Sequence, residues 1–423
     1  MLHSSYSFAL AFGADQVGGL VEELKLDRRS IILDPFCGTG TTVLESKLRG
    51  YRSIGVDANP VCVMVSQAKT DWTIDLEQAK KSITRSVLRA SHRYAAYLQR
   101  AERVKRYTVQ SDPLFQNSSI GSYLIQSGLL HRGWISPRIA LKALLLAEEI
   151  AKLPTPLKNF LFLSFLGLLV PDFSNMSYGP ELYRKRKLDD CDVFGLFDSR
   201  TNENLGKLLE LKENYKNPRC NIRLGDSANG GLSFIDRASV QAIITSPPYL
   251  SDHDYSRMTR LELVFTGTVA SRDDLRVVKK MLLRSSSKNV YKEDCRTEDV
   301  LRFAAVRDVI AAVTERARLK TSGFSKVYPK LVGEYFGGMY RHFQEVGRVL
   351  KPGGYAAYIV GDQSSFFAIP IPTARILAQL AEHCGSRLNL VSMEPVRKFR
   401  GTRGKVSWSN SEWLILLRKT SGR

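Results

Sequence analysis

The first 72 residues alternate between apolar runs and amphipathic stretches. Gln16–Leu26 is amphipathic and is followed by the apolar run Ser30–Asp34. Thr41–Gly50 has a helical pattern and precedes a second short apolar run, Arg52–Asp57. Helical stretches that alternate with short apolar runs predict a βαβ unit, and therefore a parallel sheet.

The middle of the chain has a different pattern. Ile83–Tyr107 is a long, Arg-rich helical stretch, and a polar break at residues 111–119 separates it from a second helical stretch, Ser136–Leu153. The longest apolar run, Phe160–Val170, is shorter than the ~18 residues that cross a bilayer and reads as a buried core helix. We therefore expect a mostly helical region inserted into the sheet domain, and no contact with a membrane.

Strand patterns return in the second half. Strands are predicted at Cys220–Asp226, Val240–Tyr249 and Tyr355–Gly361, and an antiparallel hairpin is predicted from Leu388–Glu394 and Glu412–Lys419. A charge-rich helical stretch is predicted at Arg272–Lys320, and further helices are predicted at Leu331–Val349 and Pro372–Cys384. The basic stretch between the two arms of the hairpin is expected to be a loop.

These elements predict an α/β fold with a doubly wound sheet. Its reversed C-terminal hairpin resembles the mixed seven-stranded sheet of class I, Rossmann-like methyltransferases. We assign the core to residues 1–72, 217–265 and 325–423, with a mostly helical insertion at 73–216 and a second insertion at 266–324.

The charge balance points to a polyanionic partner. Lys and Arg number 62 against 42 Asp and Glu, a formal net charge of +20. Neutralisation of phosphates supplies most of the non-specific affinity for nucleic acid, so this excess favours a nucleic-acid partner. Basic faces that serve only solubility are the alternative. The 43% hydrophobic and 25% charged residues exclude a fibrous or wholly disordered chain.

Cysteine and histidine spacing gives no metal motif. The six cysteines form no CxxC pair, and the six histidines form no HxxxH or HExxH pair. The absence of a disulfide pattern fits a reducing cytoplasm. The segment FALAF (Phe8–Phe12) has no Lys or Arg before it, unlike a secretory signal. We expect a metal-independent protein of the bacterial or archaeal cytoplasm.

A glycine-rich turn follows the first predicted strand. DPFCGTGTT (Asp34–Thr42) ends that strand and opens a helix, where glycines let a ligand approach the backbone and the helix N-terminus. Asp57 lies 19 residues after Gly38, close to the offset at which a carboxylate reaches ribose hydroxyls. The pattern is not GxGxxG, and Asp34 could neutralise a cationic group, as in S-adenosylmethionine. A tight turn without a ligand is the alternative.

A second motif, TSPPY (Thr245–Tyr249), ends another apolar strand. It therefore lies at the carboxyl edge of the sheet, where open α/β folds bind ligands. Ser246 Oγ and the carbonyl of Pro247 can accept both hydrogens of an exocyclic amino group. Tyr249 offers a ring on which a base can stack. A simple bend is the alternative reading of such a turn.

Together, these two motifs resemble those of the amino-methylating DNA methyltransferases. The similarity extends to HSSYSFALAF (His3–Phe12), GDS (Gly225–Ser227) and SDHDYSRMTRLEL (Ser251–Leu263), and it covers the core, about half of the chain. The family transfers a methyl group from S-adenosylmethionine to an exocyclic nitrogen of cytosine or adenine in DNA. SPPY is commoner in cytosine-N4 enzymes, which favours N4-methylcytosine over N6-methyladenine.

The resemblance implies roles for particular residues. Asp34, Phe36, Gly38, Gly40 and Thr41 would line the methionine end of the cofactor, Asp57 would bind its ribose and Asp226 its adenine amino group. The remaining candidate cofactor-binding residues are Cys37, Thr42, Ala58 and Ser227. The catalytic candidates are Ser246, Pro247, Pro248 and Tyr249, which would hold a target base flipped out of double-stranded DNA. Asp254 and Tyr255 are candidates for shaping the base pocket.

Basic segments are candidates for contact with DNA. They are the Arg-rich helix, RKRK (Arg184–Lys187) and the predicted hairpin loop, from which we select Arg397, Lys398, Arg400, Arg403 and Lys405. Either insertion could read the target, and the resemblance admits a cognate restriction endonuclease as a partner. The recognition sequence and the oligomeric state stay open.

The sequence leaves three hypotheses. The first is a cytosine-N4 DNA methyltransferase, and the second is an adenine-N6 or RNA amino-methyltransferase. The third is a catalytically silent nucleic-acid-binding protein, against which the intact tetrapeptide argues. Methylation at carbon 5 of cytosine needs a thiolate beside the site, and no cysteine lies between Cys220 and Cys295.

Overall fold

The computed structural model describes residues 2–6, 13–104, 106–179, 181–319, 323–364, 366–403 and 406–421; for 324, 399–403 and 406–410 it describes the backbone alone. The chain divides into two compact units. The helical unit comprises Met1–Ala11, Pro60–Asn217 and Tyr255–Val278. The sheet unit comprises Phe12–Asn59, Pro218–Asp254 and Lys279–Arg423.

The sheet unit is built on a mixed sheet of seven strands. In spatial order they are β5 (Cys220–Leu224), β2 (Arg52–Asp57), β1 (Ile31–Asp34), β6 (Val240–Thr245), β7 (Leu350–Gly361), β9 (Val406–Lys419) and β8 (Leu388–Arg403). Neighbouring strands from β5 to β7 are parallel, whereas β9 is antiparallel to both β7 and β8. The predicted class I methyltransferase sheet with a reversed C-terminal hairpin is therefore confirmed.

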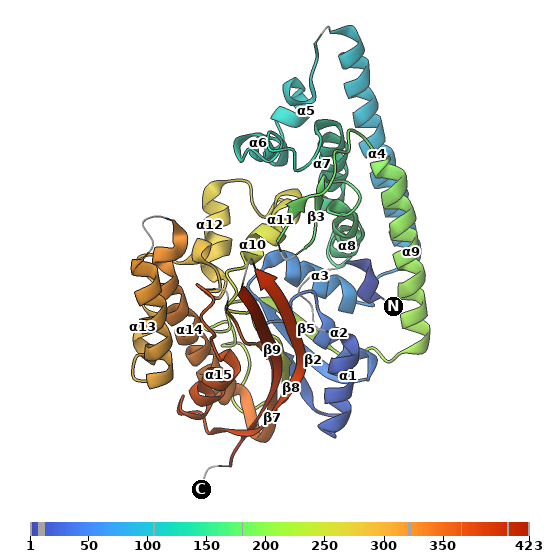
Figure 1. Cartoon of the computed structure of the whole chain (residues 1–423). Helices are drawn as coiled ribbons and strands as arrows, with labels where there is room; N and C mark the ends of the chain where they lie inside the picture. The colour runs from blue at the N-terminus through green and yellow to red at the C-terminus, as the bar shows by residue number, and fades with distance from the viewer. Residues whose placement is uncertain are drawn as a thin grey trace. The chain divides into compact units, whose positions relative to one another are not determined.

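Helices cover both faces of this sheet (Figure 1). On one face lies α1 (Ala14–Glu23), which packs with Ile32 and Ala242, and α2 (Thr41–Leu48) lies beside it. On the other face lie α13 (Ala304–Arg318), α14 (Tyr328–Val349) and α15 (Thr373–Glu382), packed with Leu33 and Ile243. Adjacent residues such as Ile32 and Leu33 face opposite layers, which explains why these strands are apolar throughout.

Two predictions for the sheet unit are wrong in detail. The basic stretch after Glu394 is not a loop, because β8 continues to Arg403 and pairs with β9 as far as Val406. The backbone hydrogen bonds of each arm are satisfied by the other arm. The strands can therefore continue through a stretch of polar residues. The stretch Arg272–Lys320 is not one helical run either. It contains α12 (Arg272–Met281), the short helices η3 (Ser287–Asn289) and η4 (Arg296–Val300), and α13.

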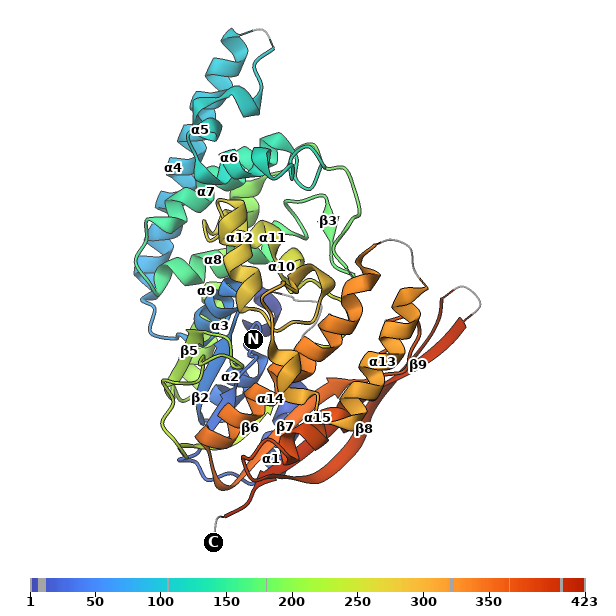
Figure 2. The ribbon, with the colours of Figure 1, turned by 90° about the vertical axis from the view of Figure 1, so that its left-hand side faces the viewer.

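The helical unit has long helices lying side by side (Figure 2). Its helices are η1 (Leu2–Ser5), α3 (Pro60–Thr70), α4 (Leu76–Arg103), η2 (Val109–Ser111), α5 (Pro113–Gln116), α6 (Ser119–Gln126), α7 (Pro137–Ala151), α8 (Leu157–Leu169), α9 (Val193–Asn214), α10 (Tyr255–Met258) and α11 (Arg260–Phe265). Two short strands, β3 (Met176–Ser177) and β4 (Tyr183–Arg184), pair with each other. The boundary between the units falls within α12.

The central helix of this unit is α8. Nearly all of its residues are buried, and it packs against α3, α7 and α9, which confirms the predicted core helix. In the described residues, no helix is long and apolar enough to cross a membrane.

Candidate active site at the carboxyl edge of the sheet

Asp34 ends β1 beside the end of β6. Its side chain is buried, and Oδ1 accepts hydrogen bonds from the Thr245 hydroxyl (2.6 Å) and from the backbone N–H of Phe36 (3.1 Å). Oδ2 is buried without a hydrogen-bond partner among the described residues. Burial raises the pKa of Asp34 to about 6. The site thus holds a carboxylate oxygen that a cationic or hydrogen-bonding ligand could satisfy.

The glycine turn leaves room beside this carboxylate. Gly38 (φ 49°) and Gly40 (φ 90°) both have left-handed backbone conformations, which side chains with a Cβ rarely adopt. A Cβ at Gly38 would meet no atom within 4 Å, so the turn borders open space. Cys37 instead packs against Gly55 of β2, which makes it a space-filling residue of the turn. Thr42, in the first turn of α2, donates to the Ile244 carbonyl of β6 (3.3 Å).

Asp57 ends β2 and connects it to the glycine turn. Its Oδ2 accepts from the backbone N–H of Gly38 (2.8 Å), and its Oδ1 accepts from the N–H of Asn59 (2.7 Å). Burial raises the pKa of Asp57 to about 6. The carboxylate therefore organises the turn, a role that the 19-residue offset did not predict. Ala58, which follows Asp57 in the chain, is half-buried.

Asp226 follows β5 and is paired with a residue that the sequence did not indicate. Its Oδ2 accepts from Arg296 Nη2 (2.9 Å), and its Oδ1 accepts from the N–H of Ala228 (2.9 Å). The neighbouring Ser227 hydroxyl and Arg296 Nη1 are buried without hydrogen-bond partners among the described residues. A Cβ at Gly337 of α14 would overlap the Arg296 carbonyl, so this helix can pass so close only with glycine there.

The tetrapeptide follows β6 directly. Tyr249 donates a hydrogen bond to Glu412 Oε1 of β9 (2.6 Å), and Ser246 Oγ donates to the Tyr249 hydroxyl (3.5 Å). A Cβ at Gly361 of β7 would lie 3.0 Å from the Tyr249 ring, so the ring rests on the backbone of the sheet. Pro247 is buried and Pro248 is half-buried. Glu412 is the second functional candidate that sequence patterns missed.

The loop beyond the tetrapeptide is held by its own acidic residues. Asp252, with φ at 63°, accepts hydrogen bonds from the N–H of Ser287 (2.6 Å) and the hydroxyl of Tyr328 (3.2 Å). Asp254 is buried and forms an ion pair with Lys279 (3.0 Å). These contacts favour a structural role for Asp254 in fixing the loop.

Phe36 is supported from α14. Its ring centroid lies 4.8 Å from that of His342, whose Nε2 is 2.8 Å from the Tyr358 hydroxyl. Burial lowers the pKa of His342 to about 3, so the imidazole is neutral. The ring that packs against Phe36 is therefore the uncharged imidazole of His342.

The fold brings together the predicted cofactor and catalytic residues at the carboxyl ends of β1, β2, β5 and β6. Of the predicted DNA contacts, Arg397 and Lys398 are exposed on β8, where Arg397 pairs with Glu412 of β9. The side chains of Arg400 and Arg403 lie outside the described ones, and Lys405 and the segment Phe8–Phe12 lie outside the described residues.

This sheet order, with a glycine turn at the point between β1 and β6 where the chain reverses its direction of winding, is that of the class I methyltransferase fold. The fold and the family imply S-adenosylmethionine as the methyl donor. The residues present fit such a cofactor, because the open space at Gly38 adjoins a turn whose neighbour Asp34 has an unsatisfied buried carboxylate oxygen.

Comparisons with known proteins point to the same class. The N6_N4_Mtase family model, described as DNA methylase, matches residues 21–68, which include the glycine turn. The type II methyltransferase M.BsoBI of Geobacillus stearothermophilus is 24% identical, covering 91% of this chain and 78% of its own. M.AvaI of Nostoc sp. is 23% identical (93% and 80%), and M.MvaI of Kocuria varians is 24% identical (85% and 76%).

A solved structure, an rRNA methyltransferase from Streptomyces viridochromogenes, matches with 10% identity over 98% of this chain and 90% of its own. Its TM-score of 0.27 is too low to inform the fold or the activity. The family match and the type II relatives, by contrast, support a DNA methyltransferase of the amino-methylating type.

Proposed function

We propose that this protein methylates the N4 amino group of cytosine within a specific sequence of double-stranded DNA. The observation that carries the proposal is the hydrogen bond between Thr245 and Asp34, because it fixes the SPPY tetrapeptide beside the glycine turn. Holding two reacting groups side by side in one orientation can lower the activation barrier by roughly 7–11 kcal/mol. Positioning is therefore the main contribution that this chain makes.

The cofactor site in this proposal is the carboxyl edge described above. Asp34 would accept the cofactor's ammonium group, the glycine turn would admit its methionine end, and Asp57 and Asp226 would bind its ribose and adenine. S-Adenosylmethionine, when bound there, supplies the electrophilic methyl group. Arg296 would orient Asp226, since it already binds one oxygen of that carboxylate.

The tetrapeptide would hold the target base. Ser246 Oγ and the Pro247 carbonyl would accept the two amino hydrogens, which favours a pyramidal nitrogen with its lone pair free to attack. Each such hydrogen bond contributes roughly 0.5–1.5 kcal/mol net. Tyr249 would stack on the base, which must leave the duplex because its amino group lies inside the base pair.

Cytosine is favoured over adenine by the serine at position 246. The related tetrapeptides DPPY and NPPY are commoner in enzymes that methylate adenine, whereas SPPY is commoner in those that methylate cytosine. Methylation of adenine N6 is the alternative, as is methylation of a base amino group in RNA. Both would use the same acceptors for the amino hydrogens.

Mass spectrometry of nucleosides tests the proposal. The purified full chain is incubated with duplex DNA of mixed sequence and labelled S-adenosylmethionine, and a parallel reaction contains RNA. We expect labelled N4-methyldeoxycytidine among the nucleosides released from DNA. Labelled N6-methyladenosine, or label in RNA alone, would overturn the cytosine proposal. Absence of label in every product, in a protein that binds the cofactor, would favour the silent binding protein.

A further inference from the structure

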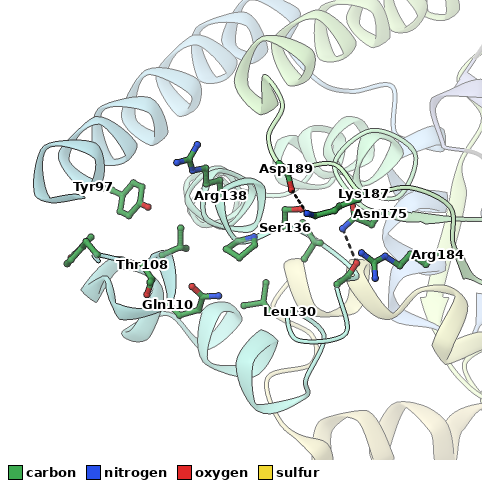
Figure 3. Close-up of a pocket in the computed structure, with 15 residues that line it drawn as sticks. Tyr97, Thr108, Gln110, Leu130, Ser136, Arg138, Asn175, Arg184, Lys187 and Asp189 are labelled. Atoms are coloured by element: carbon green, nitrogen blue, oxygen red, sulfur yellow. Dashed lines mark hydrogen bonds and ion pairs between the residues drawn. The ribbon is translucent and has the colours of Figure 1, made fainter. Parts of the chain in front are cut away.

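The helical unit contains a hollow whose lining residues are far in sequence from those of the SPPY site. Its cavity volume is about 460 Å³, and α4, α7, β4 and the segments that connect them line it. Figure 3 shows Arg138, Arg184 and Lys187 among the side chains around it, together with Tyr97 and Gln110. Nothing in the proposed methyl transfer uses this hollow.

The charges around the hollow are predominantly positive. Lys187 forms an ion pair with Asp189, the acidic residue of the lining, at 3.7 Å. Arg138 and Arg184 are exposed, and in the described part of the chain neither guanidinium group forms an ion pair or a hydrogen bond. Two guanidinium groups therefore remain without counter-charge around one cavity, which is the electrostatic setting of an anion site.

The wall that carries Arg184 is preformed. Asn175 donates to the Gly133 carbonyl (2.9 Å) and accepts from the backbone N–H of Leu188 (2.7 Å), and its own carbonyl accepts from the N–H of Lys185 (2.9 Å). These bonds fix the basic segment against the turn at Gly133. A cavity whose walls are already ordered loses less conformational entropy when it binds a ligand.

The four basic residues of RKRK have different positions. Arg186 is a structural residue, because its guanidinium donates to the carbonyls of Ser174 (3.2 Å) and Pro171 (2.7 Å). Arg184 and Lys187, by contrast, line the hollow. Arg186 therefore fixes the segment in place, whereas Arg184 and Lys187 add positive charge to the hollow. The composition of the segment alone does not show this difference.

The first turn of α7 also lines the hollow. Ser136 lies at its N-cap and donates to the Leu188 carbonyl, and Pro137 and Arg138 follow it into the lining. The free backbone N–H groups of a helix N-terminus add partial positive charge to that of Arg138. The amide of Gln110, on the same hollow, makes no hydrogen bond within the described residues and can serve a polar ligand.

We propose that this hollow binds the phosphodiester backbone of the DNA substrate. This inference rests on the proposed function, since it assumes that DNA is the substrate. Arg138 and Arg184 come from separate elements and lie at separate places around the hollow, with Lys187 and Asp189 between them (Figure 3). Such a spread suits consecutive phosphates of one strand, each bound by one guanidinium, and planar guanidinium groups bind phosphate in bidentate fashion. A free mononucleotide shares this chemistry and is the other source of phosphate.

Salt-dependent DNA binding tests the proposal. Arg138 and Arg184 are changed together to Ala, and affinity for a fluorescein-labelled duplex of mixed sequence is measured by anisotropy over a range of salt. Loss of two phosphate contacts should reduce the slope of log affinity against log salt by about two, one for each cation removed. The matched control is Arg237→Ala with Arg375→Ala, which removes two exposed arginines from the sheet unit.

The outcomes separate the two proposals. A lower slope in the double variant but not in the control supports the backbone site. An equal slope in both variants overturns it, even if the wild-type protein makes N4-methylcytosine. The proposal is overturned in favour of a free nucleotide if the wild-type protein binds deoxycytidine monophosphate tightly, the double variant does not, and both have the same salt slope for DNA. Absence of methylation by the wild-type protein counts against the proposed function itself and leaves the slope comparison valid.

Discussion

The phenol of Tyr249 donates a hydrogen bond of 2.6 Å to the carboxylate of Glu412. The two residues are 163 positions apart in the chain, and the pairing of β9 with β7 brings Glu412 opposite Gly361, on which the tyrosine ring rests. The aromatic residue of the tetrapeptide is therefore held at both its ring and its hydroxyl. A ring that must receive a flipped base benefits from a fixed orientation.

We predict that Glu412 is a positioning residue for base capture. Glu412→Ala should lower the single-turnover rate about tenfold, because a hydrogen bond to a charged acceptor contributes roughly 1.5–3 kcal/mol. Glu412→Gln, which keeps an acceptor oxygen, should lose less. Rapid-quench measurements with pre-bound cofactor and DNA give the rate, and the fluorescence of 2-aminopurine at the target reports capture of the base.

A double-mutant cycle provides the control for this prediction. Tyr249→Phe removes the same hydrogen bond from the other side and keeps the stacking ring. If the bond is what matters, Glu412→Ala should add little to a Tyr249→Phe variant. Fully additive losses would contradict the positioning role.

A second prediction concerns the pH dependence of cofactor binding. The pKa of Asp34 is about 6, raised by burial, so the carboxylate is charged above that pH and becomes protonated below it. The neutral acid cannot attract an ammonium group. Affinity for S-adenosylmethionine should therefore fall as the pH decreases through about 6, by up to about tenfold per pH unit for one proton. Isothermal titration calorimetry from pH 5 to 8 measures it.

Two controls isolate the role of Asp34. Asp34→Asn should bind the cofactor weakly at pH 8 and show a smaller dependence on pH. Methylthioadenosine lacks the amino-acid group that Asp34 would bind. Its affinity should therefore depend on the protonation of Asp57, whose pKa is also about 6, and not on that of Asp34. Equal pH profiles for S-adenosylmethionine in the wild-type and Asp34→Asn proteins would remove Asp34 from the site.

Some of this site was predictable because its signals are local. The DPFCGTGTT turn and TSPPY each combine an apolar strand with the residues that follow it, and the parallel sheet brings strand ends to one edge. The partners of these motifs were not predictable in the same way. Glu412 and Arg296 reach the site only through strand pairing and helix packing, and neither stands in a recognisable local pattern.

The terminal hairpin shows a second limit of sequence patterns. The basic residues and glycines from Arg397 onward favoured a loop, because exposed strands and loops have similar compositions. In the structure the two arms pair over this whole stretch up to Arg403 and Val406. Backbone hydrogen bonds between the two paired arms decide the conformation there, whatever the polarity of the sequence.

A third prediction separates the roles of the tetrapeptide residues. Ser246→Ala removes an acceptor for an amino hydrogen and should lower the rate of methyl transfer by about 1–3 kcal/mol in barrier, with little loss of DNA affinity. Tyr249→Ala should instead reduce capture of the flipped base. Ser251→Ala, which changes a serine of the following loop that bonds to the Tyr249 carbonyl, is a matched control. Wild-type single-turnover kinetics in Ser246→Ala would refute the assignment of this tetrapeptide as the catalytic site.

The last prediction concerns the stability of the helical unit. Glu262 is buried in α11, and its Oε1 accepts hydrogen bonds from the hydroxyls of Tyr178 (2.6 Å) and Tyr6 (3.1 Å). The three residues come from the three segments that make up this unit. Its Oε2 is buried without a hydrogen-bond partner among the described residues. The segments are therefore joined at a carboxyl group that is poorly solvated when charged.

This arrangement fixes the sign of a pH effect. Burial raises the pKa of Glu262 from 4.5 to about 7, so the folded protein holds this proton more tightly than the unfolded chain does. The stabilisation is complete below about pH 4.5 and is lost as the pH rises to about 7. Glu262→Gln keeps an oxygen for the two tyrosines and avoids the buried charge. Relative to the wild type, it should gain about 3 kcal/mol in free energy of unfolding between pH 4.5 and pH 8. Thermal melts of both proteins across that range, with the exposed Glu102→Gln as control, measure the difference, and parallel pH profiles for wild type and Glu262→Gln would show that Glu262 is ionised at no cost.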